Sequence, residues 1–187
     1  NEKVKLQITC PDQSCYTYLI SDRGAYDTFP LTAGNGSYAL QVLENVAGDT
    51  YTVSLAQSIN VSIEDEFLPF LYPNQYVNFH TDSKAVSKGS DLAKDTYSDL
   101  DVVQNIYNYV IKNISYDTEK AQNVSYGYVP DIDDTLSSKK GICFDYAALM
   151  TSMLRSQNIP TKLEVGYSGD AILNALDSPL LYGSDIS

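Results

Sequence analysis

The second half of this chain is organised around the stretch KKGICFDYAALM, residues Lys139–Met150. Gly141 leads directly into Cys143, and apolar residues then recur at the spacing of one helix face. The sequence therefore places Cys143 in the first turn of a helix, where backbone N–H groups lack partners and the helix dipole is positive. Both effects favour a nucleophilic thiolate. This position predicts a functional thiol rather than a small buried apolar residue, which is the alternative.

The end of this helix is also marked in the sequence. Arg155 falls in the last turn, where a cation suits the free carbonyl groups. Asn158 can adopt the left-handed conformation that closes a helix, and Pro160 prevents any continuation. The alternating segment Thr161–Tyr167 then predicts a strand. The unit is therefore a glycine turn, a cysteine-led helix, a short connection and a strand.

Three pieces of this unit resemble the core motif of the transglutaminase-like superfamily, the papain-like cysteine acyltransferases and hydrolases. They are Gly-Ile-Cys-Phe-Asp-Tyr-Ala, Leu-Arg-Ser-Gln-Asn-Ile-Pro and Val-Gly-Tyr, in order over residues 141–167. Upstream, Tyr116-Asp117 resembles the family's Tyr-Asp, so the resemblance covers about residues 84–170. It implies that Cys143 attacks a peptide or carboxamide carbonyl and forms a thioester.

The resemblance also implies a catalytic His and then an Asp on strands after the Gly-Tyr pair. The chain has one histidine, His80, which precedes the cysteine and is more typical of a strand end than of a base. We therefore expect the catalytic His and Asp to be absent and activity to be impaired. We expect that near Asp170 the chain is cut short, changes reading frame or is naturally degenerate. A lost half-sheet would expose an edge, so we expect a homodimer through that edge or a fold-back of residues 171–187.

Composition limits the partners. The chain has 12 Lys and Arg against 24 Asp and Glu, a net charge of −12, which argues against nucleic acid. No apolar run is long enough for a membrane span. The acidic trio Asp131, Asp133 and Asp134 lacks the rest of a calcium motif, so we expect no metal site and no cofactor. A peptide or protein substrate is the expected partner.

Cys10 and Cys15 flank a turn between two strand-like runs, and a disulfide between them is geometrically reasonable. Such a bond would indicate an oxidising compartment and would leave Cys143 as the free cysteine. The chain starts at Asn1 without a methionine, which fits a trimmed product. We therefore expect a secreted or bacterial cell-surface protein.

Residues 1–82 are predicted to be all β, because short alternating segments are separated by polar turns. These segments are Val4–Ile8, Tyr16–Ile20, Tyr38–Leu43, Tyr51–Leu55 and Ile59–Ile63. Their number and spacing favour a small antiparallel, immunoglobulin-like sandwich.

From about residue 83 the apolar period changes to that of helices. A weak helix is expected over Lys84–Asp95, and Ser98 begins a stronger one that runs to about Ile114. Residues 118–138 are expected to form a long irregular stretch. The fold class is therefore α+β: a sandwich domain (1–82) followed by a partial, truncated transglutaminase-like core (83–187).

Two functions remain open at this point. The first is an exported, impaired cysteine hydrolase or acyltransferase that uses Cys143. The second is a non-catalytic cell-surface binding or interaction module in which Cys143 is inert. The reactivity of Cys143 distinguishes them.

Overall fold

The computed structural model describes residues 3–20 and 26–164. The chain divides into two compact units, Asn1–Pro69 and Phe70–Ser187. The sequence places the division later, at residue 82. The structure moves it because the segment after Phe70 is tied to the second unit: Arg155 donates to the Tyr72 carbonyl at 2.7 Å, and the Thr161 N–H donates to the Phe70 carbonyl at 3.0 Å.

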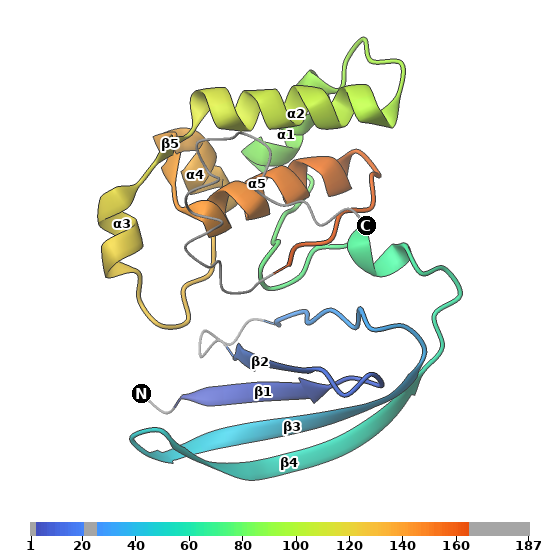
Figure 1. Cartoon of the computed structure of the whole chain (residues 1–187), viewed down its shortest axis with the longest axis vertical. Helices are drawn as coiled ribbons and strands as arrows, with labels where there is room; N and C mark the ends of the chain where they lie inside the picture. The colour runs from blue at the N-terminus through green and yellow to red at the C-terminus, as the bar shows by residue number, and fades with distance from the viewer. Residues whose placement is uncertain (1–2, 21–25, 165–187) are drawn as a thin grey trace, which may run out of the picture. The chain divides into compact units, whose positions relative to one another are not determined.

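The first unit contains one antiparallel sheet (Figure 1). Its strands, in the spatial order β2-β1-β3-β4, are β1 (Val4–Thr9), β2 (Cys15–Leu19), β3 (Gly36–Ala47) and β4 (Thr50–Val61). The described residues of this unit form no second sheet, so the predicted immunoglobulin-like sandwich is not seen. The reason is that two predicted strands, Tyr51–Leu55 and Ile59–Ile63, belong to one continuous β4 that pairs with β3 along its length.

One face of this sheet carries the buried side chains Ile8, Tyr18 and Tyr38, which are 2%, 6% and 0% exposed. Tyr38 donates its hydroxyl proton to the Gly34 carbonyl at 2.8 Å and accepts from the Ala33 N–H at 3.1 Å. A buried tyrosine hydroxyl needs such partners, because an unpaired polar group in the interior is costly. The segment before β3 therefore packs onto the sheet.

The second unit is mainly helical, so the chain is α+β as expected. A 3-10 turn, Leu68–Phe70, lies where the two units join. The helices are α1 (Lys84–Leu92), α2 (Asp99–Asn113), α3 (Thr118–Asn123), α4 (Ile132–Ser138) and α5 (Cys143–Ser156). Two short parallel strands, β5 (Ser115–Tyr116) and β6 (Lys140–Gly141), precede α3 and α5 respectively. Helix α5 is central, since α1, α2 and α4 all pack against it (Figure 1).

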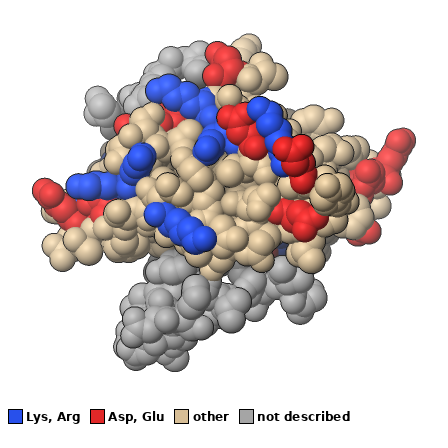
Figure 2. Space-filling model, turned by 90° about the horizontal axis from the view of Figure 1, so that it is seen from above, with Lys and Arg blue, Asp and Glu red and all other residues tan. Residues whose placement is uncertain are grey.

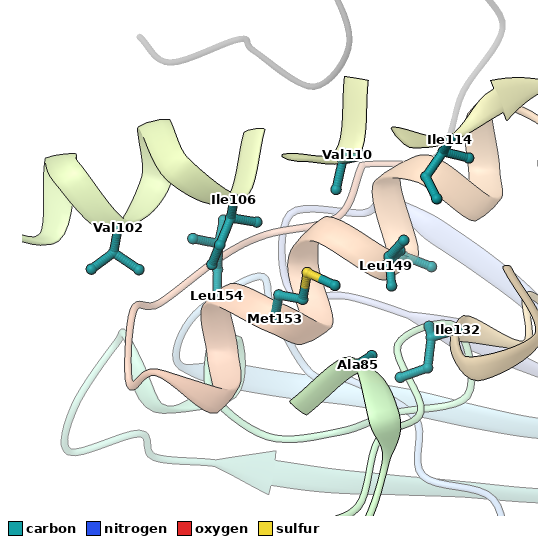
Figure 3. Close-up of a cluster of buried hydrophobic side chains, with 10 residues drawn as sticks. Ala85, Val102, Ile106, Val110, Ile114, Ile132, Leu149, Met153 and Leu154 are labelled. Carbon is teal, nitrogen blue, oxygen red and sulfur yellow. The ribbon is translucent and has the colours of Figure 1, made fainter. Parts of the chain in front are cut away.

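The core of the second unit forms where α2 meets α5 (Figure 3). On α2, apolar residues recur every fourth position, which gives one continuous stripe. Leu149 and Met153, both 0% exposed, face it from α5. The full cluster is Ala85, Val102, Ile106, Val110, Ile114, Ile132, Ala148, Leu149, Met153 and Leu154. Burial of each large side chain contributes roughly 1.5–3 kcal/mol, so this cluster fixes the position of α5.

The start of α2 agrees with the sequence. Ser98 is its N-cap and accepts from the Asp101 N–H at 3.2 Å. The Asp101 carboxylate in turn accepts from the Ser98 hydroxyl at 2.8 Å and from the Tyr97 N–H at 3.2 Å. This reciprocal pairing satisfies orphan donors at the helix start.

The prediction of an irregular stretch over residues 118–138 is wrong, because α3 and α4 lie there. Both are short helices with acidic N-caps: Asp117 accepts from the Lys120 N–H, and Asp131 accepts from the Asp133 and Asp134 N–H groups. Their few apolar residues give no clear helical period, so the caps carry the signal.

One member of the acidic trio Asp131, Asp133 and Asp134 also stabilises the start of α1. Asp133 accepts from the backbone N–H groups of Lys84 at 3.0 Å and Ala85 at 2.9 Å, at the start of α1. A carboxylate suits this position because the N-terminal end of a helix is positive. Among the described residues, no group of three or more His, Cys, Asp or Glu is arranged to hold a metal ion.

The connection after α5 matches the sequence only in part. Asn158 adopts the left-handed conformation, with φ 61°, as predicted. The strand predicted over Thr161–Tyr167 is not present in residues 161–164, and its remainder lies outside the described residues. The expectations about Asp170 and residues 171–187 also lie outside them.

The surface carries charges of both signs. On the face shown in Figure 2, acidic and basic side chains occur among larger uncharged areas. In the part of the chain that the structure describes, no helix has both the length and the apolar character needed to cross a membrane.

Candidate active site at the start of helix α5

Cys143 is the first residue of α5 and is exposed. Ile142 is the N-cap, in an extended conformation with φ −93° and ψ 176°. The thiol therefore stands where the chain turns from an extended segment into a helix. Backbone N–H groups in this first turn have no helical acceptor, so they are available to an anion at the sulfur or to an oxygen beside it.

Two strand-to-helix turns lie next to each other at this site. The parallel strands β5 and β6 are joined by the Ser115 N–H, which donates to the Lys139 carbonyl at 2.8 Å. The Asp117 N–H then donates to the Gly141 carbonyl at 2.9 Å. These bonds bring the start of α3 beside the start of α5, although about 25 residues of chain lie between the paired positions Ser115 and Lys140.

Gly141 is required by the close approach of the helix. A Cβ at this position would lie 2.7 Å from the Asp145 Cβ, a separation that real side chains essentially never show. Only glycine therefore allows the Asp145 side chain to fold back under the turn. Two residues before Gly141, Lys139 closes α4 with a left-handed φ of 56°.

The Asp145 carboxylate is completely buried beneath this turn, with 0% exposure. It accepts from the Ile142 N–H at 2.8 Å and from the Lys120 Nζ at 2.7 Å, and the Tyr128 hydroxyl donates to its other oxygen. The Lys120 Nζ also lies 4.6 Å from the centre of the Tyr128 ring. We call Lys120, Tyr128 and Asp145 the Asp145 triad, in which Asp145 is buried and the other two are half-buried. It connects α3 and the segment after it to residues 141–143, which we call the nucleophile turn after the role that the family resemblance implies for Cys143.

The protonation states of Lys120 and Tyr128 in the Asp145 triad follow from their contacts. Burial alone lowers the pKa of Lys120, but hydrogen bonds to Asp145 and Tyr128 outweigh burial, so the pKa is raised. Burial, followed by the hydrogen bond to Asp145, raises the pKa of Tyr128. Near neutral pH Lys120 is therefore charged. The Tyr128 hydroxyl stays protonated and donates a hydrogen bond to Asp145.

Aromatic rings surround Phe144, the residue after the cysteine. The Tyr76 ring meets it edge-on at 5.3 Å between centroids, and the Tyr128 ring does so at 6.4 Å. Burial, with a smaller contribution from Tyr126, raises the pKa of Tyr76, which stays neutral. Edge-to-face packing holds the first turn of α5 from a second side.

Arg155 anchors the other end of α5. Its side chain is 5% exposed, and its Nε donates to the Thr161 carbonyl at 2.9 Å while its Nη1 donates to the Tyr72 carbonyl. Burial lowers the pKa of Arg155 to about 10, so it stays charged near neutral pH. The sequence places this cation at the helix end, and the structure shows that it also ties two distant segments together.

The one histidine of the chain does not meet the cysteine through a side-chain bond. His80 is exposed and lies in the turn before α1, where its backbone N–H donates to the Ser83 hydroxyl at 2.9 Å. Among the described residues, no hydrogen bond joins the His80 ring to Cys143.

The predicted disulfide is not formed in the structure, where Cys10 and Cys15 are both free. Cys15 pairs with Thr9 across β1 and β2, and the Thr9 hydroxyl lies 3.8 Å from its sulfur. Because successive residues leave an extended chain in opposite directions, Cys10, the residue after Thr9, is directed away from Cys15. Accordingly, Cys10 is buried and Cys15 is exposed.

Sequence reasoning did not identify the Asp145 triad. One local signal was available, because Asp145 follows the N-cap by three residues, the place from which a carboxylate can bond the N-cap N–H. The apolar Ile142 at the N-cap hides this signal. Lys120 and Tyr128 give none, since they lie 25 and 17 residues from Asp145.

Comparison with known proteins gives one family match. Residues 86–177 match the model of the transglutaminase-like superfamily. The match confirms the family suggested by the sequence.

Two similar proteins can be described. The UPF0252 protein MJ1282 of Methanocaldococcus jannaschii is 35% identical over 69 residues, which are 34% of this chain and 20% of that protein. The chain thus spans about a fifth of that relative's length. A crystal structure from Cytophaga hutchinsonii, described as a "putative cysteine protease", covers 85% of this chain and 61% of that one, with 14% sequence identity and a TM-score of 0.43.

Proposed function

We propose that this protein is a cysteine hydrolase or acyltransferase that acts on peptide or carboxamide bonds through Cys143. The observation that supports the proposal most is the position of Cys143, exposed at the first turn of α5 within the superfamily segment. A thiol there has unpaired N–H groups beside it, which favour the thiolate that acts as nucleophile.

The proposed reaction has two halves. The Cys143 sulfur bonds to the substrate carbonyl carbon, the carbonyl oxygen takes the negative charge, and first-turn N–H groups such as that of Cys143 can stabilise it. The C–N bond then breaks, and the amine leaves with a proton from a donor. Water or a second amine finally attacks the thioester and releases the sulfur.

The proton for the leaving amine limits this scheme. The described residues around Cys143 include no histidine bonded to it, and general acid catalysis contributes typically 10²–10⁴-fold. We therefore propose that this chain forms a thioester readily from an activated ester but cleaves amides slowly. A nitrophenyl ester needs no proton donor, because nitrophenolate leaves as a stable anion.

This difference gives the test. The chain is mixed with a nitrophenyl ester of a blocked glutamine and, separately, with the matching anilide. We expect a stoichiometric burst of nitrophenolate and a thioester on the peptide that contains Cys143, detected by mass spectrometry, with little anilide cleavage. Cys143→Ala abolishes the burst, whereas Cys15→Ala, which removes the other exposed cysteine, preserves it.

A different outcome would favour the non-catalytic alternative. If Cys143 acylates no faster than Cys15, the thiol is inert and the chain is better understood as a binding or interaction module. The secreted or cell-surface location, the peptide or protein substrate and self-association through a sheet edge stay predictions of the sequence. Fractionation and sedimentation of the native protein would test them separately.

A further inference from the structure

A buried carboxylate below the nucleophile turn presents an electrostatic problem. Asp145 is two residues from Cys143 in sequence, and its carboxylate is 0% exposed. Asp145 is buried while Cys143 is exposed, and a nearby like charge disfavours a second anion, so an uncompensated carboxylate here would disfavour the Cys143 thiolate. It nevertheless holds the Ile142 N–H at 2.8 Å and so shapes the turn.

Lys120 supplies the compensating charge. Its Nζ lies 2.7 Å from one Asp145 oxygen, and its side chain is 28% exposed, so the ammonium reaches the interior from the rim of the site. The α3 start is held beside the α5 start by the Asp117 to Gly141 backbone bond, which fixes where Lys120 can reach. Tyr128 adds a neutral donor to the other carboxylate oxygen.

We propose that Lys120 is a positioning residue for the proposed thiol chemistry: it neutralises Asp145, so that this carboxylate can shape the nucleophile turn without suppressing the Cys143 thiolate. The proposal rests on the proposed function and deepens it. Lys120 acts through Asp145 and does not touch the substrate. Tyr128 supports the geometry, and its neutral hydroxyl carries no compensating charge.

The test measures the rate of iodoacetamide alkylation of Cys143 as a function of pH, with the labelled peptide quantified by mass spectrometry. Lys120→Met removes the charge and leaves Asp145 buried without its counter-ion. We expect alkylation near neutral pH to slow about tenfold, and the pH midpoint to rise by about one unit. Lys120→Arg keeps a cation in place and should restore most of the wild-type profile.

A matched control removes the same kind of charge elsewhere. Lys94 pairs with Asp91 at 2.6 Å, and both side chains are more than half exposed. Lys94→Met should leave the alkylation profile unchanged. A loss of net positive charge alone would shift both variants, whereas the proposed local effect shifts only the Lys120 variant.

The Asp145→Asn background covers the case in which Lys120→Met fails to fold. Asn keeps an oxygen that can accept from the Ile142 N–H. The double variant Asp145→Asn/Lys120→Met carries neither charge, and proteins often tolerate the replacement of both members of a buried ion pair by neutral residues. In this background Lys120→Met should no longer raise the pH midpoint. Equal shifts in both backgrounds, or no shift in a folded Lys120→Met chain, would overturn the proposal.

The two proposals fail in different ways. If wild-type Cys143 alkylates as slowly as Cys15, the proposed function fails, whatever the Lys120 variants show. If wild-type Cys143 is fast and Lys120→Met is equally fast with the same pH midpoint, the proposed function stands and the role of Lys120 is wrong.

Discussion

The two units of this chain bury different kinds of side chain. In the described part of the first unit, the buried residues are Ile8, Cys10, Tyr18 and Tyr38. The second unit has a large apolar cluster, and it also buries polar or charged side chains: Ser83, Thr135, Asp145, Thr151, Ser152 and Arg155.

This difference indicates where the chain accepts an energetic cost to fix geometry. A buried charge is expensive unless it is paired and hydrogen-bonded. Asp145 and Arg155 lie near opposite ends of α5. Asp145 accepts from the Lys120 and Tyr128 side chains, and Arg155 donates to two backbone carbonyls outside the helix. Pairing of the first unit's sheet needs no such groups. Among the described residues, the two buried charged side chains therefore both lie on the helix that carries Cys143.

The largest expected effect tests the buried carboxylate. Asp145→Ala strands the Lys120 ammonium, the Tyr128 hydroxyl and the Ile142 N–H, so we expect a loss of about 3–5 kcal/mol in the free energy of unfolding. Urea unfolding followed by the helical circular dichroism signal measures it, because the described α-helices all lie in the second unit. Asp91→Ala, which removes an exposed carboxylate, should cause no measurable change. Equal effects would remove the distinction between the two sites.

A core truncation sharpens the contrast between the units. Leu149 on α5 is 0% exposed, and Leu149→Ala should cost about 2–5 kcal/mol because it leaves a cavity. Leu55 on β4 is 57% exposed, and Leu55→Ala should stay within about 0.5 kcal/mol. The same urea titration measures the first variant, and hydrogen exchange of β4 measures the second. A large effect at Leu55 would mean that the sheet face is covered.

A smaller loss than that of Leu149→Ala is expected from a substitution that probes the first unit alone. Tyr38→Phe removes the hydroxyl that bonds Gly34 and Ala33. A net loss of about 1 kcal/mol follows, since one buried hydrogen bond is typically worth that much. Hydrogen exchange of the β3 amides should report it while the helical signal of the second unit stays unchanged. A shift in the helical signal would show that the units do not unfold independently.

Local signals explain which parts of the fold could be predicted from the sequence. The Ser98 start of α2, the Gly141 turn and the Asn158 closure depend on neighbours within a few residues, and all three are present. The strands of the first unit were located, but their joining into one long β4 was not, because Gln57 and Ser58 interrupt the apolar alternation without ending the strand.

The site was predictable only as far as Cys143. Its position follows from the glycine and from the helical period that comes after it. The Asp145 triad depends on two hydrogen bonds between residues that lie 17 and 25 positions apart in the sequence, and no local pattern encodes such bonds. The disulfide prediction used the turn between two strand-like runs and lacked the strand register, which pairs Cys15 with Thr9.

The pairing of β5 with β6 has a consequence for how the motif is studied. A synthetic peptide of residues 139–158 would contain the whole cysteine-led helix, but not Lys120, Tyr128 or the strand that aligns them. Its sulfur would stand above an unmatched carboxylate, on a helix too short to persist in water. On the proposed role of Lys120, the reactivity of this thiol is a property of the assembled second unit, and we expect it to be absent from its most recognisable fragment.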